Sequence, residues 1–217
     1  MKKRKCTLVV LALAALCFIV TGCSGMVDMA QSQPSYFASE EEIAAAKDIL
    51  GDDLSAMKVS VDGVIYSYPM TVQFLLDEGW EFPAEALAEL DPFPANTEYR
   101  NCEMSRTLGE QEQTMDALVL LNESLEDIPV GEAMVTIYGI DRSQKHKMIL
   151  PGGITWTSTI DDVKAAYGEP TSEGSSGSEE TFINTILTYN YDSGHVRIGF
   201  QTKNGETQMT GVSFYAE

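Results

Sequence analysis

The chain has 217 residues, of which 33 are Asp or Glu and 14 are Lys or Arg, so its formal net charge at pH 7 is −19. Such an acidic chain repels the phosphates of nucleic acids and of anionic lipids, which excludes nucleic-acid binding as an expected function. The length suffices for one domain or two small ones.

The first residues form a targeting signal. A basic segment, Lys2–Lys5, precedes the 13 apolar residues Leu8–Val20, a run shorter than the about 20 residues of a membrane-spanning helix. The run ends in Val20-Thr21-Gly22-Cys23, which resembles the lipobox of bacterial lipoproteins. The resemblance implies cleavage before Cys23 and attachment of fatty acyl chains such as palmitate. An ordinary secretory signal is the alternative, but it would need an A-x-A-like cleavage site, which is absent here.

Lipid on Cys23 would fix the location of the protein. Several acyl chains on one residue anchor a protein stably, so we expect an extracytoplasmic protein held at the cell membrane, with residues 23–38 as a tether. Ser24 would permit sorting to the outer membrane in a Gram-negative host, as the lipoprotein resemblance implies. Cleavage removes residues 1–22 and leaves 10 basic and 33 acidic residues, a formal charge of −23.

The cysteines predict a core without disulfides. Cys6 and Cys17 leave with the signal peptide and Cys23 would carry lipid, so only Cys102 remains. No internal disulfide can form, although the compartment would permit one. Nothing in the flanking sequence "RNCEMS" supplies a base that would activate a nucleophile, so we expect a buried strand residue at Cys102.

The first half of the mature chain alternates short helices and strands. Ser39 and Glu42 form a capping box that predicts a helix over residues 40–50, closed by Gly51. Asp62-Gly63 predicts the turn of a β-hairpin within residues 58–68. The remaining expected elements are a helix capped by Thr71 and stopped by Gly79, a helical turn or two at 84–90, and strands at 99–107, 114–122 and 133–140.

The second half repeats this order. A strand and loop begin at Met148, and "TIDDVKAAYGEP" predicts a helix that Thr159 caps and Gly168 stops. The Gly/Ser-rich segment "TSEGSSGSEE", residues 171–180, is interpreted as a mobile loop. The remaining strands are expected at 181–191, 195–202 and 208–215.

These elements predict an α+β fold built from two tandem units, residues 39–143 and 144–217. In each unit a short helix would pack on a three- to four-stranded antiparallel sheet. Alignment of Thr71 with Thr159 matches T-V-x-x-L with T-I-x-x-V, but the closing glycine falls one residue out of step. Chance similarity of two short amphipathic helices is therefore the alternative to a duplication.

The last three strands have one apolar and one polar face. The polar face, neutral to slightly basic in a very acidic chain, is a candidate protein-binding surface, although a solvated sheet face is the commoner explanation. The aromatic residues near the two helices and on the strands are further candidates, with core packing as the alternative. The candidate binding residues are Thr188, Asn190, His195, Arg197 and Gln201 on the face, with Trp80, Tyr138 and Trp156.

Convergent catalytic groups are not evident in the sequence. His146 and His195 are the two histidines, and neither belongs to an H-E-x-x-H or Cys-pair pattern, so we expect no metal site and no cofactor. His146 in "SQKHKM" is interpreted as an exposed turn residue. The acidic clusters lack the alternation of a calcium loop, and the sequence predicts a protein that is not an enzyme.

One segment resembles a known family. Gly153-Ile-Thr155, Thr159, Val163 and Tyr167-Gly168-x-Pro170 are similar to the signature of small envelope lipoproteins of the SmpA/OmlA type, which share the fold of the β-lactamase inhibitor protein. "VDGVIYSYPMTVQFLLDEGW" further resembles lipoproteins of clostridia. The resemblance implies a scaffold that presents a sheet face to another envelope protein. The alternative is an envelope enzyme, or a receptor for a small ligand or cation, with a cleft between the two units.

Overall fold

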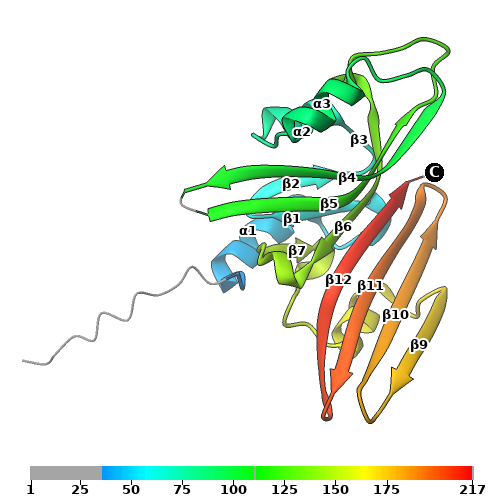
Figure 1. Cartoon of the computed structure of the whole chain (residues 1–217). Helices are drawn as coiled ribbons and strands as arrows, with labels where there is room; N and C mark the ends of the chain where they lie inside the picture. The colour runs from blue at the N-terminus through cyan, green and yellow to red at the C-terminus, as the bar shows by residue number, and fades with distance from the viewer. Residues whose placement is uncertain (1–35, 110, 217) are drawn as a thin grey trace, which may run out of the picture. The chain divides into compact units, whose positions relative to one another are not determined.

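The computed structural model describes residues 36–109 and 111–216 (Figure 1). These residues lie in one compact unit. The predicted signal peptide, the predicted lipid attachment at Cys23 and the tether up to residue 35 lie outside the described residues. Within the described part, no helix is both long and apolar enough to cross a membrane.

Three of the four described α-helices begin at the caps that the sequence predicts, namely Ser39, Thr71 and Thr159. The four helices are α1 (Glu40–Leu50), α2 (Val72–Asp77), α3 (Ala84–Leu90) and α4 (Ile160–Tyr167), with single 3₁₀ turns at Leu54–Ala56, Val130–Glu132, Arg142–Gln144 and Pro151–Gly153. Ser39 and Thr159 each form a complete capping box, and the Thr71 hydroxyl accepts a hydrogen bond from the Phe74 N–H. The predicted helix starts are confirmed because they depend on local hydrogen bonds.

The larger sheet has eight antiparallel strands. Its main path runs β4-β5-β6-β12-β11-β10-β9, and the short β3 also pairs with β6 (Figure 1). The strands are β3 (Met70–Thr71), β4 (Thr97–Leu108), β5 (Gln111–Asn122), β6 (Met134–Asp141), β9 (Ser172–Ser178), β10 (Phe182–Tyr191), β11 (Gly194–Lys203) and β12 (Glu206–Ala216). The six strands expected between residues 99 and 215 are therefore confirmed, although they were expected in two separate sheets. The pairing of β11 with β12 shifts register between Gly199 and Phe200.

A second sheet of four strands has the order β2-β1-β7-β8. Its strands are β1 (Lys58–Val61), β2 (Val64–Ser67), β7 (Met148–Leu150) and β8 (Ile154–Thr155). The predicted hairpin turn is confirmed, because Asp62 and Gly63 have φ values of 52° and 86°, as a tight two-residue turn requires.

The division into two tandem units with separate sheets is not confirmed. β6 of the expected first unit pairs with β12 of the second, and β7 of the second pairs with β1 of the first. Both sheets thus contain strands from both sides of residue 143. The structure shows an α+β fold with few helices packed against antiparallel sheets.

The prediction of a mobile loop at residues 171–180 is wrong for most of this segment. Ser172–Ser178 form β9, an edge strand that pairs along seven positions with β10. Its side chains are all exposed, so an apolar pattern does not reveal it. The strand forms because β10 would otherwise leave backbone N–H and C=O groups unpaired along its edge.

One main hydrophobic core joins the two sheets. It contains residues from both halves of the chain, among them Val59, Leu75, Met104, Val163 and Phe214, each fully buried. A smaller cluster of Ala46, Leu50 and Ile149 lies under α1. The inward side of β10–β12 contributes Leu187, Tyr189, Val196, Ile198, Phe200, Val212 and Phe214, which leaves the alternate residues on the opposite face.

Candidate functional site

The polar residues predicted on β10 and β11 share one face. We call it the outer face, and it carries Thr188, Asn190, His195, Arg197, Gln201 and Tyr215. Asn190 and Arg197 are exposed, and the other four are half-buried. Asn190 lies opposite His195 and Thr188 opposite Arg197, so these side chains form adjacent cross-strand rows.

Tyr215 of β12 orders the basic part of the outer face. The His195 ring stacks on the Tyr215 ring with centroids 4.2 Å apart and an angle of 9° between planes. The Arg197 guanidinium carbon lies 4.8 Å from the centre of the same ring, within the range of a cation–π contact. This cluster offers the Arg197 guanidinium to an acidic group of another molecule and the stacked His195 and Tyr215 rings to an aromatic group.

Gln201 extends the outer face toward β12. Its side-chain amide donates to the Asn184 amide oxygen at 3.2 Å. It also lines a polar depression with Tyr36, Asp141, Arg142, Ser143, Lys145, Gln208 and Thr210. The five polar residues proposed from the sequence therefore lie together.

The three other candidate binding residues lie in the core. Trp80, Tyr138 and Trp156 are only 0 %, 1 % and 2 % exposed. The Trp80 indole N–H donates to the Tyr66 hydroxyl at 3.0 Å, and that of Trp156 donates to the His146 carbonyl at 2.7 Å. The three rings therefore present no surface to a partner, and the polar atoms of both tryptophans are satisfied inside the protein, so the structure corrects the anchor interpretation in favour of core packing.

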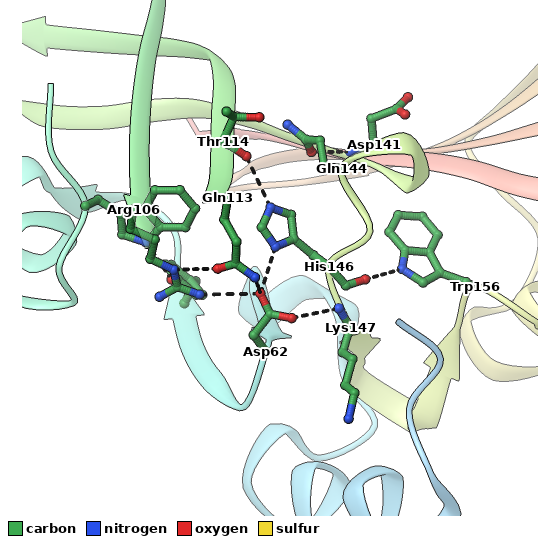
Figure 2. A network of polar contacts seen from close by, with 11 residues as sticks. Asp62, Arg106, Gln113, Thr114, Asp141, Gln144, His146, Lys147 and Trp156 are labelled. Atoms are coloured by element: carbon green, nitrogen blue, oxygen red, sulfur yellow. Dashed lines mark hydrogen bonds and ion pairs between the residues drawn. The ribbon is translucent and has the colours of Figure 1, made fainter. Parts of the chain in front are cut away.

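His146 is not an exposed turn residue. Its side chain is 1 % exposed and lies in a polar cluster that the sequence pattern does not reveal (Figure 2). We call this cluster the Asp62 network: the side chains of Asp62, Arg106, Gln113 and His146, with the backbone of Thr114 and Lys147. It connects the β1–β2 turn, the β4–β5 hairpin and the segment before β7.

The Asp62 carboxylate is the centre of this network (Figure 2). Its Oδ2 lies 2.7 Å from His146 Nδ1, accepts from Gln113 Nε2 at 2.8 Å and is 3.4 Å from an Arg106 nitrogen. Its Oδ1 accepts from the Lys147 N–H at 2.9 Å. Arg106 Nε also donates to Gln113 Oε1 at 2.8 Å. Each polar side chain therefore contacts at least one other member.

The network holds Asp62 as a carboxylate. Burial raises the pKa of Asp62, but hydrogen bonds from His146, the Lys147 backbone and Gln113, with the nearby His146 charge, outweigh burial and hold the pKa below its usual value. His146 Nε2 faces the Thr114 carbonyl oxygen at 3.1 Å. Both His146 contacts are hydrogen bonds together only when each ring nitrogen carries a proton. The geometry therefore places the Asp62 carboxylate between the Arg106 guanidinium and the His146 ring.

Trp80 covers the Arg106 side of the network. The guanidinium carbon of Arg106 lies 4.4 Å from the centre of the Trp80 ring, and the His146 ring is 6.1 Å away in an edge orientation. Because these groups are buried and mutually bonded, the network fixes how the two sheets meet. Asp62, Gln113 and Lys147 also line a surface groove.

Cys102 is confirmed as a buried strand residue. Its side chain is 3 % exposed, and burial raises the pKa of its thiol to about 11. At neutral pH such a thiol is protonated and is a poor nucleophile. Among the described residues, no group of three or more His, Cys, Asp or Glu is placed to hold a metal ion.

The surface groove lies beside α1, and we call it the α1 groove. Its volume is about 370 Å³, and its walls come from α1, from β1, β2 and β7, and from the end of β4. Lys147 and Glu42 form an ion pair of 2.6 Å at its rim. Ile49 and Leu108, which also line it, are 65 % and 52 % exposed.

Comparison of the chain with protein-family models, with curated proteins and with solved structures finds no match.

Proposed function

We propose that this chain is a lipid-anchored extracytoplasmic protein that binds another protein of the cell envelope through the outer face and is not an enzyme. The observation that carries the proposal is that Thr188, Asn190, His195, Arg197 and Gln201 share one sheet face, on which His195 and Arg197 contact the Tyr215 ring. Tyr and Arg are common energetic centres of protein interfaces. The side chains stand on paired strands, so the backbone beneath them is already ordered before a partner binds.

Charge supports the choice of this face. The residues that define the outer face include His195 and Arg197 but no acidic side chain, while the whole chain has a net charge of −19. An acidic group on a partner would be repelled by much of this protein and attracted at the outer face. The partner surface is therefore proposed to present Asp or Glu beside an apolar or aromatic side chain.

The proposal includes a fold of two repeated units, like that of the β-lactamase inhibitor protein, which the sequence resembles. Two runs of three strands, β4-β5-β6 and β10-β11-β12, meet through the antiparallel pairing of β6 with β12. The third strand of each run thus lies at the middle of the sheet, an order that a duplicated unit would produce. The Thr-capped helices α2 and α4 precede the two runs and agree with the same interpretation.

A photo-crosslinking amino acid at Asn190 tests the proposed interface in living cells. We expect one reproducible crosslinked protein from this position, and none from Glu85, an exposed position on α3. Arg197→Glu should reduce the product at least about fivefold, because it replaces an attractive charge with a repulsive one, whereas Lys164→Glu on α4 should leave it unchanged. Crosslinked products that are equal from both positions, or that persist in Arg197→Glu, contradict the proposal.

The membrane anchor has its own test. Cys23→Ala should move the protein from the membrane fraction to the soluble fraction of lysed cells, because the acyl chains would no longer be attached. Cys102→Ala is the matched control and should leave the protein with the membranes, since the Cys102 thiol is buried in the folded domain. If Cys23→Ala protein is processed normally and stays membrane-bound, the lipobox interpretation fails.

A further inference from the structure

We propose that the α1 groove is a binding site for a small uncharged amphiphile, with an apolar chain and one neutral polar head such as an amide, ester or hydroxyl. This inference goes beyond the proposed protein partner, since the groove and the outer face have no defining residue in common. The groove has a volume of about 370 Å³, within the about 300–1,000 Å³ that is typical of small-molecule sites.

The apolar walls of the groove define where the chain of the ligand would lie. They are formed by Ala45, Ala46, Ile49, Ile65, Leu108 and Ile149. Ile49 and Leu108 are among the most exposed large apolar side chains of the described residues, and both border the same groove. An apolar ligand would remove this surface from water, which is the main source of affinity in such sites.

Ser60 supplies a buried polar contact. The residue is 3 % exposed and lines the groove. Its neighbours Val59 and Val61 point into the main core, so the alternation of β1 directs Ser60 to the opposite, α1-facing side. Its hydroxyl can donate or accept a hydrogen bond, so it can contact the polar head of a ligand in the groove.

The charges around the groove indicate a neutral head. The Glu42 carboxylate accepts from the Lys147 ammonium and from the Ser39 N–H. The Asp62 carboxylate is held by Arg106 and His146. Every charged side chain that lines the groove thus has an opposite charge beside it, and a charged head would enter without a counterion. A neutral head can bond to Ser60 without this cost.

The test uses residues 24–217 without lipid, because detergent would compete for an apolar groove and residues 34–217 already contain the compact unit. The probes are octanamide, octanoate and octylammonium, which share a chain length and differ in charge. We expect saturable binding of octanamide by NMR titration, with amide shifts at Ser60, Ile49 and Lys147. Each charged probe should bind about tenfold more weakly or worse.

Two matched variants locate the site. Ala45 and Ala44 are both exposed residues of α1, but only Ala45 lines the groove. Ala45→Trp should weaken octanamide binding at least about tenfold by filling the groove, while Ala44→Trp should leave it unchanged. Ser60→Ala should weaken it about two- to tenfold through loss of one hydrogen bond.

Three results would overturn the inference: no saturable octanamide binding, unchanged affinity in Ala45→Trp, or equal affinity for a charged probe. Crosslinking from Asn190 measures protein binding at the outer face, and Asn190 does not line the groove. A failure of the groove inference can therefore be told apart from a failure of the proposed protein interface.

Discussion

Asp62→Asn is expected to lower the free energy of unfolding by about 3–5 kcal/mol at pH 7, the usual cost of removing one partner from a buried ion pair. The side chains of Asp62, Arg106 and His146 are only 10 %, 6 % and 1 % exposed. The amide of the variant cannot neutralise Arg106 or accept all the hydrogen bonds that the carboxylate accepts. Urea denaturation followed by circular dichroism measures the loss.

Asp48→Asn is the matched control for Asp62→Asn. Asp48 is an exposed residue of α1, so the same change of one charge should alter stability by no more than about 0.5 kcal/mol. A similar, small effect at both positions would contradict the structural role of the Asp62 network. Asp62→Asn combined with Arg106→Met should cost less than the sum of the single variants, because the double variant no longer buries an unpaired guanidinium.

The effect of Asp62 should depend on pH in a defined direction. The pKa of Asp62 is lowered in the folded protein, so its ionisation stabilises the fold above the unfolded-state pKa of about 4. This contribution is lost as the pH falls through the lower, folded-state pKa. The difference in stability between the wild-type protein and Asp62→Asn should therefore shrink as the pH falls below about 4. If this stability difference increases as the pH falls, the prediction is contradicted.

Local signals in the sequence predicted the helices and turns well. Ser39 with Glu42 and Thr159 with Asp162 form the expected capping boxes, and Asp62-Gly63 forms the expected turn. These signals succeed because each involves residues no more than about four apart in the chain. The faces of β10 and β11 were also predictable, since alternation along a strand directly decides which side chains are buried.

Pairings between distant segments could not be read from the sequence. β1 with β7 and β6 with β12 join residues that local periodicity does not relate. The contact of His146 with Asp62 spans 84 positions and exists only because β7 pairs with β1. One signal was available: Arg106 follows Cys102 and Met104 on the buried side of β4, and a charged residue in such a row predicts a buried partner.

β9 and the tryptophans show two further limits of sequence interpretation. β9 has no apolar residue, so its pairing depends on the free edge of β10 and not on its own side chains. Trp80 and Trp156 occupy similar positions beside short helices, where a core residue and a binding anchor have the same sequence context. Only the packing around them separates these two roles.

Trp80→Ala is expected to destabilise the protein by about 3–5 kcal/mol, the usual cost of truncating a large buried aromatic side chain. The ring is fully buried, and its loss also removes the hydrogen bond to the Tyr66 hydroxyl and the cation–π contact with Arg106. Since small domains have a total stability of about 5–15 kcal/mol, the variant would be marginally folded. Trp80→Phe keeps an aromatic ring beside Arg106 and should lose less.

Unfolding of the Trp80 variants can be followed through Trp156, because the chain contains two tryptophans. Trp156 is 2 % exposed, so its fluorescence should shift to longer wavelength when the core opens. A core role predicts that the transition of Trp80→Phe falls between those of the wild-type protein and Trp80→Ala, with crosslinking from Asn190 unchanged in Trp80→Phe. A binding-anchor role predicts the reverse, namely a lost crosslink with unchanged stability. That result would require Trp80 to leave the core when the partner binds, at the cost of uncovering Arg106.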